Sequence, residues 1–150
     1  MTLNEFLQAM DSRGSGASEK SIALFEKELG GKLPADYRDF LLKSNGGSCG
    51  GGVIFKKSGP SIHHVFGLRS EKHLSLSWRL KLQRKGNGMP IPDDQIAIMD
   101  DPGGSPICLV WQGRKSGEIH RWGPMATKRI AGSLVEFIKG IREFSEEDDD

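Results

Sequence analysis

Residues 95–122 read QIAIMDDPGGSPICLVWQGRKSGEIHRW, and this stretch decides the fold class. Apolar segments within it are separated by Asp101-Pro102-Gly103-Gly104 and by the segment 113–117, which begins and ends with glycine. Proline fixes φ and glycine allows a positive φ, so both breaks are typical of chain reversals. The pattern predicts three antiparallel strands joined by two short turns.

Helical patterns lie on both sides of this predicted meander. Residues 2–10 space their apolar side chains as in a short amphipathic helix. Residues 18–44 predict a helical hairpin, with Ser18 as N-cap, a Gly-Gly break at 30–31, and Pro34 in the first turn of the second helix. A C-terminal helix capped by Ser133 is predicted from one apolar stripe: Leu134, Phe137, Ile138, Ile141 and Phe144.

The segment between the hairpin and the meander is less regular. Five glycines in residues 46–52 predict a flexible entry into a first strand at 53–56, and alternation at 62–66 predicts a second strand. In residues 74–82 leucines and Trp78 alternate strictly with polar residues, a periodicity that predicts a third strand here. Together these elements define an α+β domain with a mostly antiparallel sheet and helices covering one face of it.

Length and composition fit one globular domain. The chain has 150 residues, 36% of them hydrophobic, and a formal net charge of +1. We expect a short helix and connector at 1–17, one domain at 18–144 and a disordered acidic tail at 145–150. No segment has the apolar core of a signal peptide or membrane span, and Cys49 and Cys108 are too few for a disulfide framework, which favours a cytoplasmic protein with reduced thiols.

The near-neutral net charge arises because a positive main part of the chain and a negative C-terminal end cancel. Residues 1–145 carry +6, from 21 positive and 15 negative side chains, and residues 146–150 carry −5. Two groups of basic residues, at 69–85 and 114–129, are candidates for phosphate contacts. The first group holds Trp78 as its one aromatic residue, so a solvated face is favoured over nucleic-acid binding.

The sequence predicts neither a catalytic site nor a metal site. His63 and His64 are adjacent, and in a strand adjacent side chains point to opposite faces, so the two should not chelate one ion together. His73 and His120 stand alone in the sequence. The acidic pairs at 93–94 and 100–101 lie beside proline and glycine, where aspartate is a common turn residue, and no nucleotide-binding glycine motif is present.

Four segments carry a recognisable pattern in order and spacing. They are Ile22-x-x-Phe25-Glu26-x-x-Leu29-Gly30-x-x-Leu33-Pro34-x-x-Tyr37-x-x-Phe40-Leu41 with Asn45-Gly46-Gly47, Ile98-x-x-Asp101-Pro102-Gly103-Gly104-x-x-Ile107-Cys108-Leu109, Gly117-x-Ile119-x-x-Trp122, and Ala131-x-Ser133-Leu134-x-x-Phe137. This pattern resembles the SUKH superfamily, which includes the fungal cell-wall assembly regulator and many small bacterial proteins. The resemblance covers roughly residues 18–144. The sequence departs from the family pattern after Trp122, where Gly123-Pro124 stands in place of an acidic residue and a histidine.

This resemblance implies an α+β fold with a largely antiparallel sheet, and a helix rather than a strand near residues 74–85, which we adopt. It brings no catalytic residue or cofactor. It implies a bacterial immunity protein that neutralises a cognate polymorphic or contact-dependent toxin, often a nuclease or deaminase. A regulatory adaptor is the alternative, and nucleic-acid binding ranks below both.

The matching positions are mainly structural, so the partner surface has to be sought elsewhere. We expect it where charge is uncompensated near the meander, and oligomeric state, monomer or homodimer, stays open. The candidate contact residues are Asp93, Asp94, Asp100 and Asp101, with Arg79, Lys81, Arg84 and Lys85.

Overall fold

The computed structural model describes residues 1–11, 15–86 and 89–145. Within these ranges seven strands form one sheet, and every strand pairing is antiparallel. The strands are β1 (Gly47–Phe55), β2 (Ser61–Val65), β3 (Gln95–Asp100), β4 (Pro106–Val110), β5 (Ile119–Trp122), β6 (Thr127–Ala131) and β7 (Ile141–Glu143). The helices are α1 (Leu3–Gln8), α2 (Glu19–Leu29), α3 (Ala35–Lys43), α4 (Leu76–Lys85) and α5 (Leu134–Lys139), with a 3₁₀ turn η1 (Lys72–Leu74).

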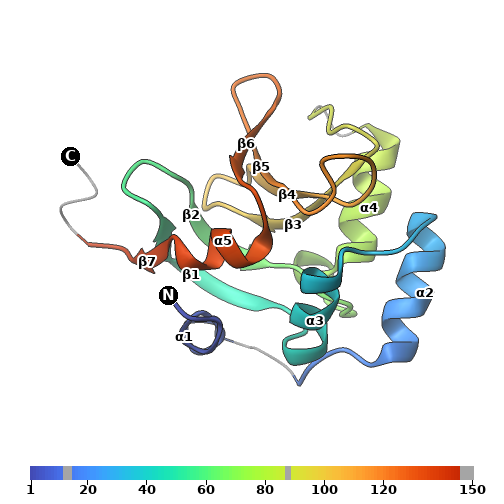
Figure 1. Cartoon of the computed structure of the whole chain (residues 1–150), viewed down its shortest axis with the longest axis horizontal. Helices are drawn as coiled ribbons and strands as arrows, with labels where there is room; N and C mark the ends of the chain where they lie inside the picture. Colours follow the sequence, from blue (N-terminus) through green and yellow to red (C-terminus); the bar gives the residue numbers. More distant parts are fainter. Residues whose placement is uncertain (12–14, 87–88, 146–150) are drawn as a thin grey trace.

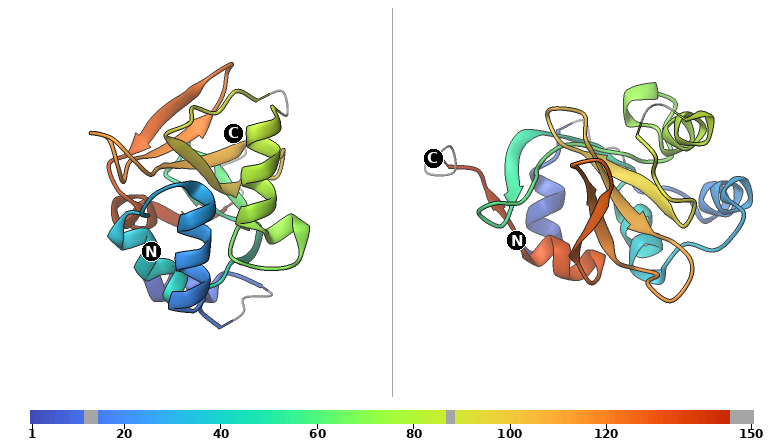
Figure 2. Two further views of the ribbon diagram at one scale, coloured as in Figure 1. Left: turned by 90° about the vertical axis from the view of Figure 1, so that its right-hand side faces the viewer. Right: turned by 90° about the horizontal axis from the view of Figure 1, so that it is seen from above.

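The sheet is a meander with one exception to sequence order. Its strand order is β6-β5-β4-β3-β2-β1-β7, so β1 to β6 are neighbours in sequence and β7 returns to the outer side of β1. The β5–β6 hairpin projects away from helices α1 to α3, whereas α2 and α4 lie side by side (Figures 1 and 2). The predicted α+β class and the three-strand meander at 95–122 are confirmed.

The centre of the sheet is covered on both faces. All residues of β3 and β4 are buried, although successive side chains of a strand point to opposite sides. The expectation that helices cover a single face is therefore wrong for the central strands. The predicted N-terminal helix also contributes to the same core, because Phe6, Leu7 and Met10 are buried in it.

The structure decides the element at residues 74–85 in favour of a helix. Leu76 and Leu80 are buried on one side of α4, and the Ser75 hydroxyl accepts the Trp78 N–H at 3.1 Å as the N-cap bond. The strand predicted from alternation is wrong. Leu74 and Trp78 would share one face of such a strand, but in the structure they lie in different environments. Leu74 is buried in η1, and Trp78 is 36% exposed.

Strand β1 begins earlier than predicted, at Gly47 and not at Val53. Ser48 pairs with His64 and Val53 with Ile62, so β1 advances five residues while β2 advances two. The extra residues form a bulge, in which Gly50 and Gly51 adopt φ of 59° and 78°. The glycine-rich stretch is thus part of the sheet.

The C-terminal apolar stripe continues past the end of its helix. Ser133 caps α5 as predicted, accepting the Glu136 N–H at 3.0 Å, but α5 ends at Lys139. Residues 141–143 form β7 because the chain there pairs with β1, placing Ile141 opposite Phe55. The prediction of a helix reaching Phe144 is therefore wrong.

The helical hairpin is closed by a buried carboxylate. Glu26 of α2 is 4% exposed, and its Oε2 accepts the Leu33 N–H at 2.7 Å across the connection to α3. Arg38 of α3 lies 3.5 Å from the other oxygen, and Lys32 lies 3.9 Å from it. The carboxylate thus satisfies a buried backbone donor and receives two cations.

We expect Glu26→Ala to lower the free energy of unfolding by about 2 kcal/mol, because the Leu33 N–H then loses its partner. Glu26→Gln should cost less, since its amide oxygen still accepts that bond. Urea denaturation followed by circular dichroism measures both variants. Equal stability of Glu26→Ala and the unmodified chain would contradict this account.

The Tyr37 hydroxyl is buried without a hydrogen-bond partner among the described residues. Its ring stacks on Phe40 with centroids 6.2 Å apart, and burial raises the pKa of the phenol well above its usual value. The ring therefore stabilises the core, whereas the oxygen adds a desolvation cost.

Tyr37→Phe should leave the free energy of unfolding unchanged or raise it by up to about 1 kcal/mol, since only the unpaired hydroxyl is removed. Tyr37→Leu should lower it by about 1 kcal/mol or more, because the aromatic contact is lost. Thermal and urea unfolding compare the two. A marked loss of stability in Tyr37→Phe would show that the hydroxyl has a partner.

Candidate functional site

The sheet has a narrow connection between its two halves, and side chains gather there. In the described chain, β2 and β3 share the one matched pair Val65–Met99, and the Phe66 N–H donates to the Ile98 carbonyl at 2.9 Å. We call this connection the β2–β3 seam. Beyond it, the side chain of Asp100 continues the contact between the strands.

Asp100 is 6% exposed and holds the seam from β3. Its Oδ1 accepts the backbone N–H of His64 at 2.9 Å and lies 3.0 Å from His64 Nδ1. Its Oδ2 lies 3.6 Å from Nη2 of Arg79, whose guanidinium stands 4.6 Å from the Phe66 ring centroid. The buried carboxylate therefore ties β2, β3 and α4 together.

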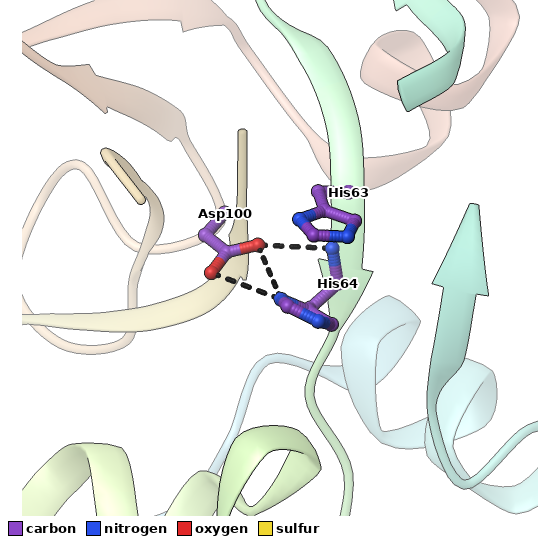
Figure 3. A group of neighbouring side chains, drawn as sticks. All are labelled: His63, His64 and Asp100. Carbon is purple, nitrogen blue, oxygen red and sulfur yellow. Dashed lines mark hydrogen bonds and ion pairs between the residues drawn. The ribbon is translucent and has the colours of Figure 1, made fainter. Parts of the chain in front are cut away.

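His63 and His64 do not separate to opposite faces, so the prediction from strand alternation is wrong. Their rings stack with centroids 3.9 Å apart, and both rings lie beside Asp100 (Figure 3). The physical reason is the bulge in β1: Ser48 pairs with His64 and Val53 with Ile62, which leaves His63 opposite the extra residues. The regular pleat is interrupted at His63.

His73 and His120 also have neighbours, contrary to expectation. The His73 ring, on η1, meets the His64 ring edge-on with centroids 5.7 Å apart. The His120 Nε2 lies 3.0 Å from the Glu118 carboxylate. Histidines 63, 64 and 73 thus form a group at the seam, and His120 is separate from it.

The eight predicted contact residues fall into two sets. Four of them, Arg79, Asp100, Asp101 and Arg84, are engaged within the fold. Arg79 faces Asp100, and Asp101 Oδ1 accepts the Gly103 and Ser105 N–H groups at 2.9 Å each. Arg84 donates to the carbonyls of Glu28 and Leu29 at 3.0 and 2.8 Å. The other four side chains are exposed: Lys81, Lys85, Asp93 and Asp94.

Of the exposed four, Asp93 lines a hollow together with Arg84, so the C-terminal end of α4 lies near the segment that precedes β3. Trp78, Lys81 and Lys85 follow helical spacing along the outer side of α4, with Lys72 Nζ 4.5 Å from the Trp78 ring. Leu24 of α2, 60% exposed, lines a second hollow with Ser77 of α4.

We define the α2–α4 surface as Leu24, Trp78, Lys81, Lys85, Asp93 and Asp94. It combines apolar side chains with both signs of charge, a composition found at protein interfaces. Sequence reasoning missed Leu24 as an exposed apolar residue because it lies within an amphipathic helix pattern. The signal available in the sequence was that Leu24 is a large apolar residue outside the stripe of residues that α2 buries.

The motif positions shared with the SUKH pattern serve the fold. Leu33, Tyr37 and Phe40 are buried, and Pro34 directly precedes α3. Gly46 adopts a φ of 84° where a Cβ would lie 2.5 Å from the Val65 carbonyl oxygen. The remaining motif residues lie at strand ends or in the β3–β4 turn: Gly47, Asp101, Gly103, Gly104 and Trp122.

Neither cysteine is placed as a nucleophile. Burial raises the pKa of Cys49 to about 12, with Asp11 adding to the effect. Burial also raises the pKa of Cys108 to about 12, opposed by Arg79. Both groups are therefore neutral thiols at physiological pH.

Iodoacetamide at pH 8 should label native Cys49 and Cys108 slowly. Raising a thiol pKa from 9.0 to about 12 lowers its thiolate fraction by roughly a thousandfold. Mass spectrometry of native and denatured samples measures the difference. Rapid labelling of either cysteine in the folded chain would contradict the burial described here.

The geometry so far defines a class: a small α+β domain around a seven-stranded antiparallel sheet, with a helical hairpin before it. Residues 16–140 match the model of the SMI1/KNR4 family (SUKH-1), and the chain belongs to this family. A crystal structure of a protein from Pseudomonas syringae pv. tomato is similar at a TM-score of 0.61 and 14% identity, covering 91% of this chain and 93% of that one. At that identity the likeness concerns the fold alone, and no curated protein matches.

In the described residues, no helix has the length and apolar character needed to cross a membrane.

Proposed function

We propose that this protein is a cytoplasmic, non-enzymatic immunity protein that binds and neutralises a cognate polymorphic or contact-dependent toxin domain. Membership in the SUKH-1 family, which includes immunity proteins, is the observation that carries the proposal. The motif residues are occupied with folding, so the partner has to be recognised by side chains outside them. Stoichiometric binding fits such an arrangement.

The α2–α4 surface supports this proposal as the contact region. Trp78 is its large aromatic side chain, and aromatic residues are enriched among those that dominate binding energies. Lys81 and Lys85 follow Trp78 along the same side of α4, free of the contacts that hold Arg79 and Arg84. The partner that fits is a protein surface with an apolar pocket beside acidic groups.

Asp93 and Asp94 form the second part of this surface. Because Asp100 and Asp101 are engaged in the fold, the acidic contribution at this edge falls to these two residues. For a basic nuclease toxin, the proposed role of Asp93 and Asp94 is to occupy its phosphate-binding cleft by charge complementarity. The acidic residues 146–150, a further candidate for that role, lie outside the described residues.

Nucleic acid is a weaker candidate partner because the first basic group is largely compensated. Arg69 pairs with Glu71, and Arg79 faces Asp100. Arg84 is held by backbone carbonyls at the end of α2, and Lys72 stands over Trp78. Lys81 and Lys85 alone do not make the extended positive stripe that phosphate backbones require.

Co-expression with a candidate toxin domain tests the proposal, and the gene expected to encode that domain lies immediately upstream of this one. The toxin should be lethal alone and harmless with this protein, and purified toxin domain should form a stoichiometric complex. Trp78→Ala should weaken that complex about 30-fold, and Lys81→Glu with Lys85→Glu about tenfold. Calorimetry measures the affinities, and survival reports the function.

The matched control is Lys115→Glu with Lys128→Glu, which makes the same charge change at exposed positions in the β4–β5 turn and in β6. It should leave affinity within about threefold. Unchanged toxin lethality would contradict the immunity function, and complex formation without rescue would favour a regulatory adaptor. Equal losses in the two double variants would remove the α2–α4 surface from the proposal.

A further inference from the structure

We propose that His63, His64 and Asp100 form a binding site for one borderline divalent transition metal ion, with Zn²⁺ as the reference ion. In the described part of the chain these residues form a group in which one ligand atom from each lies within 4.8 Å of the others. The site is distinct from the α2–α4 surface and does not depend on the proposed toxin partner.

The ligand set selects the class of ion. Two imidazole nitrogens and one carboxylate oxygen are typical ligands of Zn²⁺, Co²⁺, Ni²⁺ and Cu²⁺. Mg²⁺ and Ca²⁺ prefer sites built from oxygen atoms, so two of the three donors here are unsuited to them. Three protein ligands leave one position of a tetrahedral ion for water.

The geometry of the group is close to that of a coordinated ion. His64 Nδ1 and Asp100 Oδ1 are 3.0 Å apart, compared with about 3.3 Å between two ligands of a tetrahedral zinc ion. The stacked His63 ring brings its nitrogens to the same side (Figure 3). A small opening of the His64–Asp100 pair and a small approach of His63 suffice to surround the ion.

The carboxylate is held in place before an ion arrives. Asp100 Oδ1 accepts the His64 backbone N–H, and Arg79 lies on the side of Oδ2. Such supporting contacts orient metal ligands in proteins. Arg79 also places a positive charge near the site, so we expect an affinity well below that of structural zinc sites.

Binding at His64 Nδ1 requires a change of tautomer. An ionised carboxylate only accepts, so His64 Nδ1 carries the proton of its bond to Asp100. When a nitrogen–metal bond forms at Nδ1, this N–H bond breaks, its proton passes to water, and Nε2 of the same ring takes up a proton from water. The neutral imidazole therefore binds the ion with no net release of a proton.

The test uses the full chain without a histidine tag, stripped with a chelator and titrated with zinc chloride. Calorimetry should give one site per chain, and excess zinc should raise the melting temperature. Cobalt chloride should produce visible absorption bands of a low-symmetry Co²⁺ site. His63→Ala and His63→Gln should lower zinc affinity at least about tenfold while keeping the His64–Asp100 bond.

His73→Ala is the matched control, since it removes an exposed histidine that touches His64 but lies outside the ligand group. It should change affinity less than threefold. Thermal melting without metal verifies that each variant folds. If His63→Ala or His63→Gln does not fold, the other variant still tests the assignment. Absence of saturable binding, unchanged affinity in both His63 variants, or an equal loss in His73→Ala would overturn the assignment.

Discussion

The buried carboxylate of Asp100 is the contact on which the arrangement of the sheet depends. Strands β1, β2 and β7 lie on one side of the β2–β3 seam and strands β3 to β6 on the other. Little backbone pairing crosses the seam. The Asp100 side chain, which accepts the His64 backbone N–H, therefore adds a hydrogen bond between β2 and β3 where the strands have few of their own. A buried charge is stable only when paired, and Arg79 and His64 provide the partners.

This constraint also positions α4. Arg79 reaches Asp100 from the first half of the helix, while Gln83 donates to the Gln95 carbonyl at 2.8 Å from its second half. The two contacts set α4 along β3, and Leu76 and Leu80 of the helix are buried. The opposite side of the helix, which carries Trp78, Lys81 and Lys85, consequently faces outward beside α2.

The family motif and the candidate sites occupy different parts of the molecule. Glu26, Leu33 and Tyr37 build the helical hairpin, and the Asp101–Gly104 turn joins β3 to β4. These positions have local, geometric requirements that any protein of this fold must meet. Contact with a particular partner has no such requirement, so the proposed contact residues lie outside the shared motif, which does not reveal them.

Sequence alone determined the elements whose signals are local. Capping serines, turn glycines and prolines, and apolar periodicity are properties of a few neighbouring residues, and they predicted the helical hairpin and the β3–β5 meander. Periodicity was insufficient at 74–85, where leucines alternate but enter different environments, and the family resemblance supplied the helix. It was also insufficient at 141–143, where pairing with β1 converts a helical stripe into a strand.

Only the tertiary structure decided which charges are available and which histidines meet. Aspartates 93, 94, 100 and 101 look alike in the sequence. In the structure Asp100 is buried and paired, and the Asp101 carboxylate accepts hydrogen bonds within the β3–β4 turn, so neither charge is available at the surface. His63 and His64 meet because a bulge in another strand, built on Gly50 and Gly51, interrupts the alternation that adjacent residues normally follow. Such outcomes depend on contacts between residues distant in sequence, which no local pattern contains.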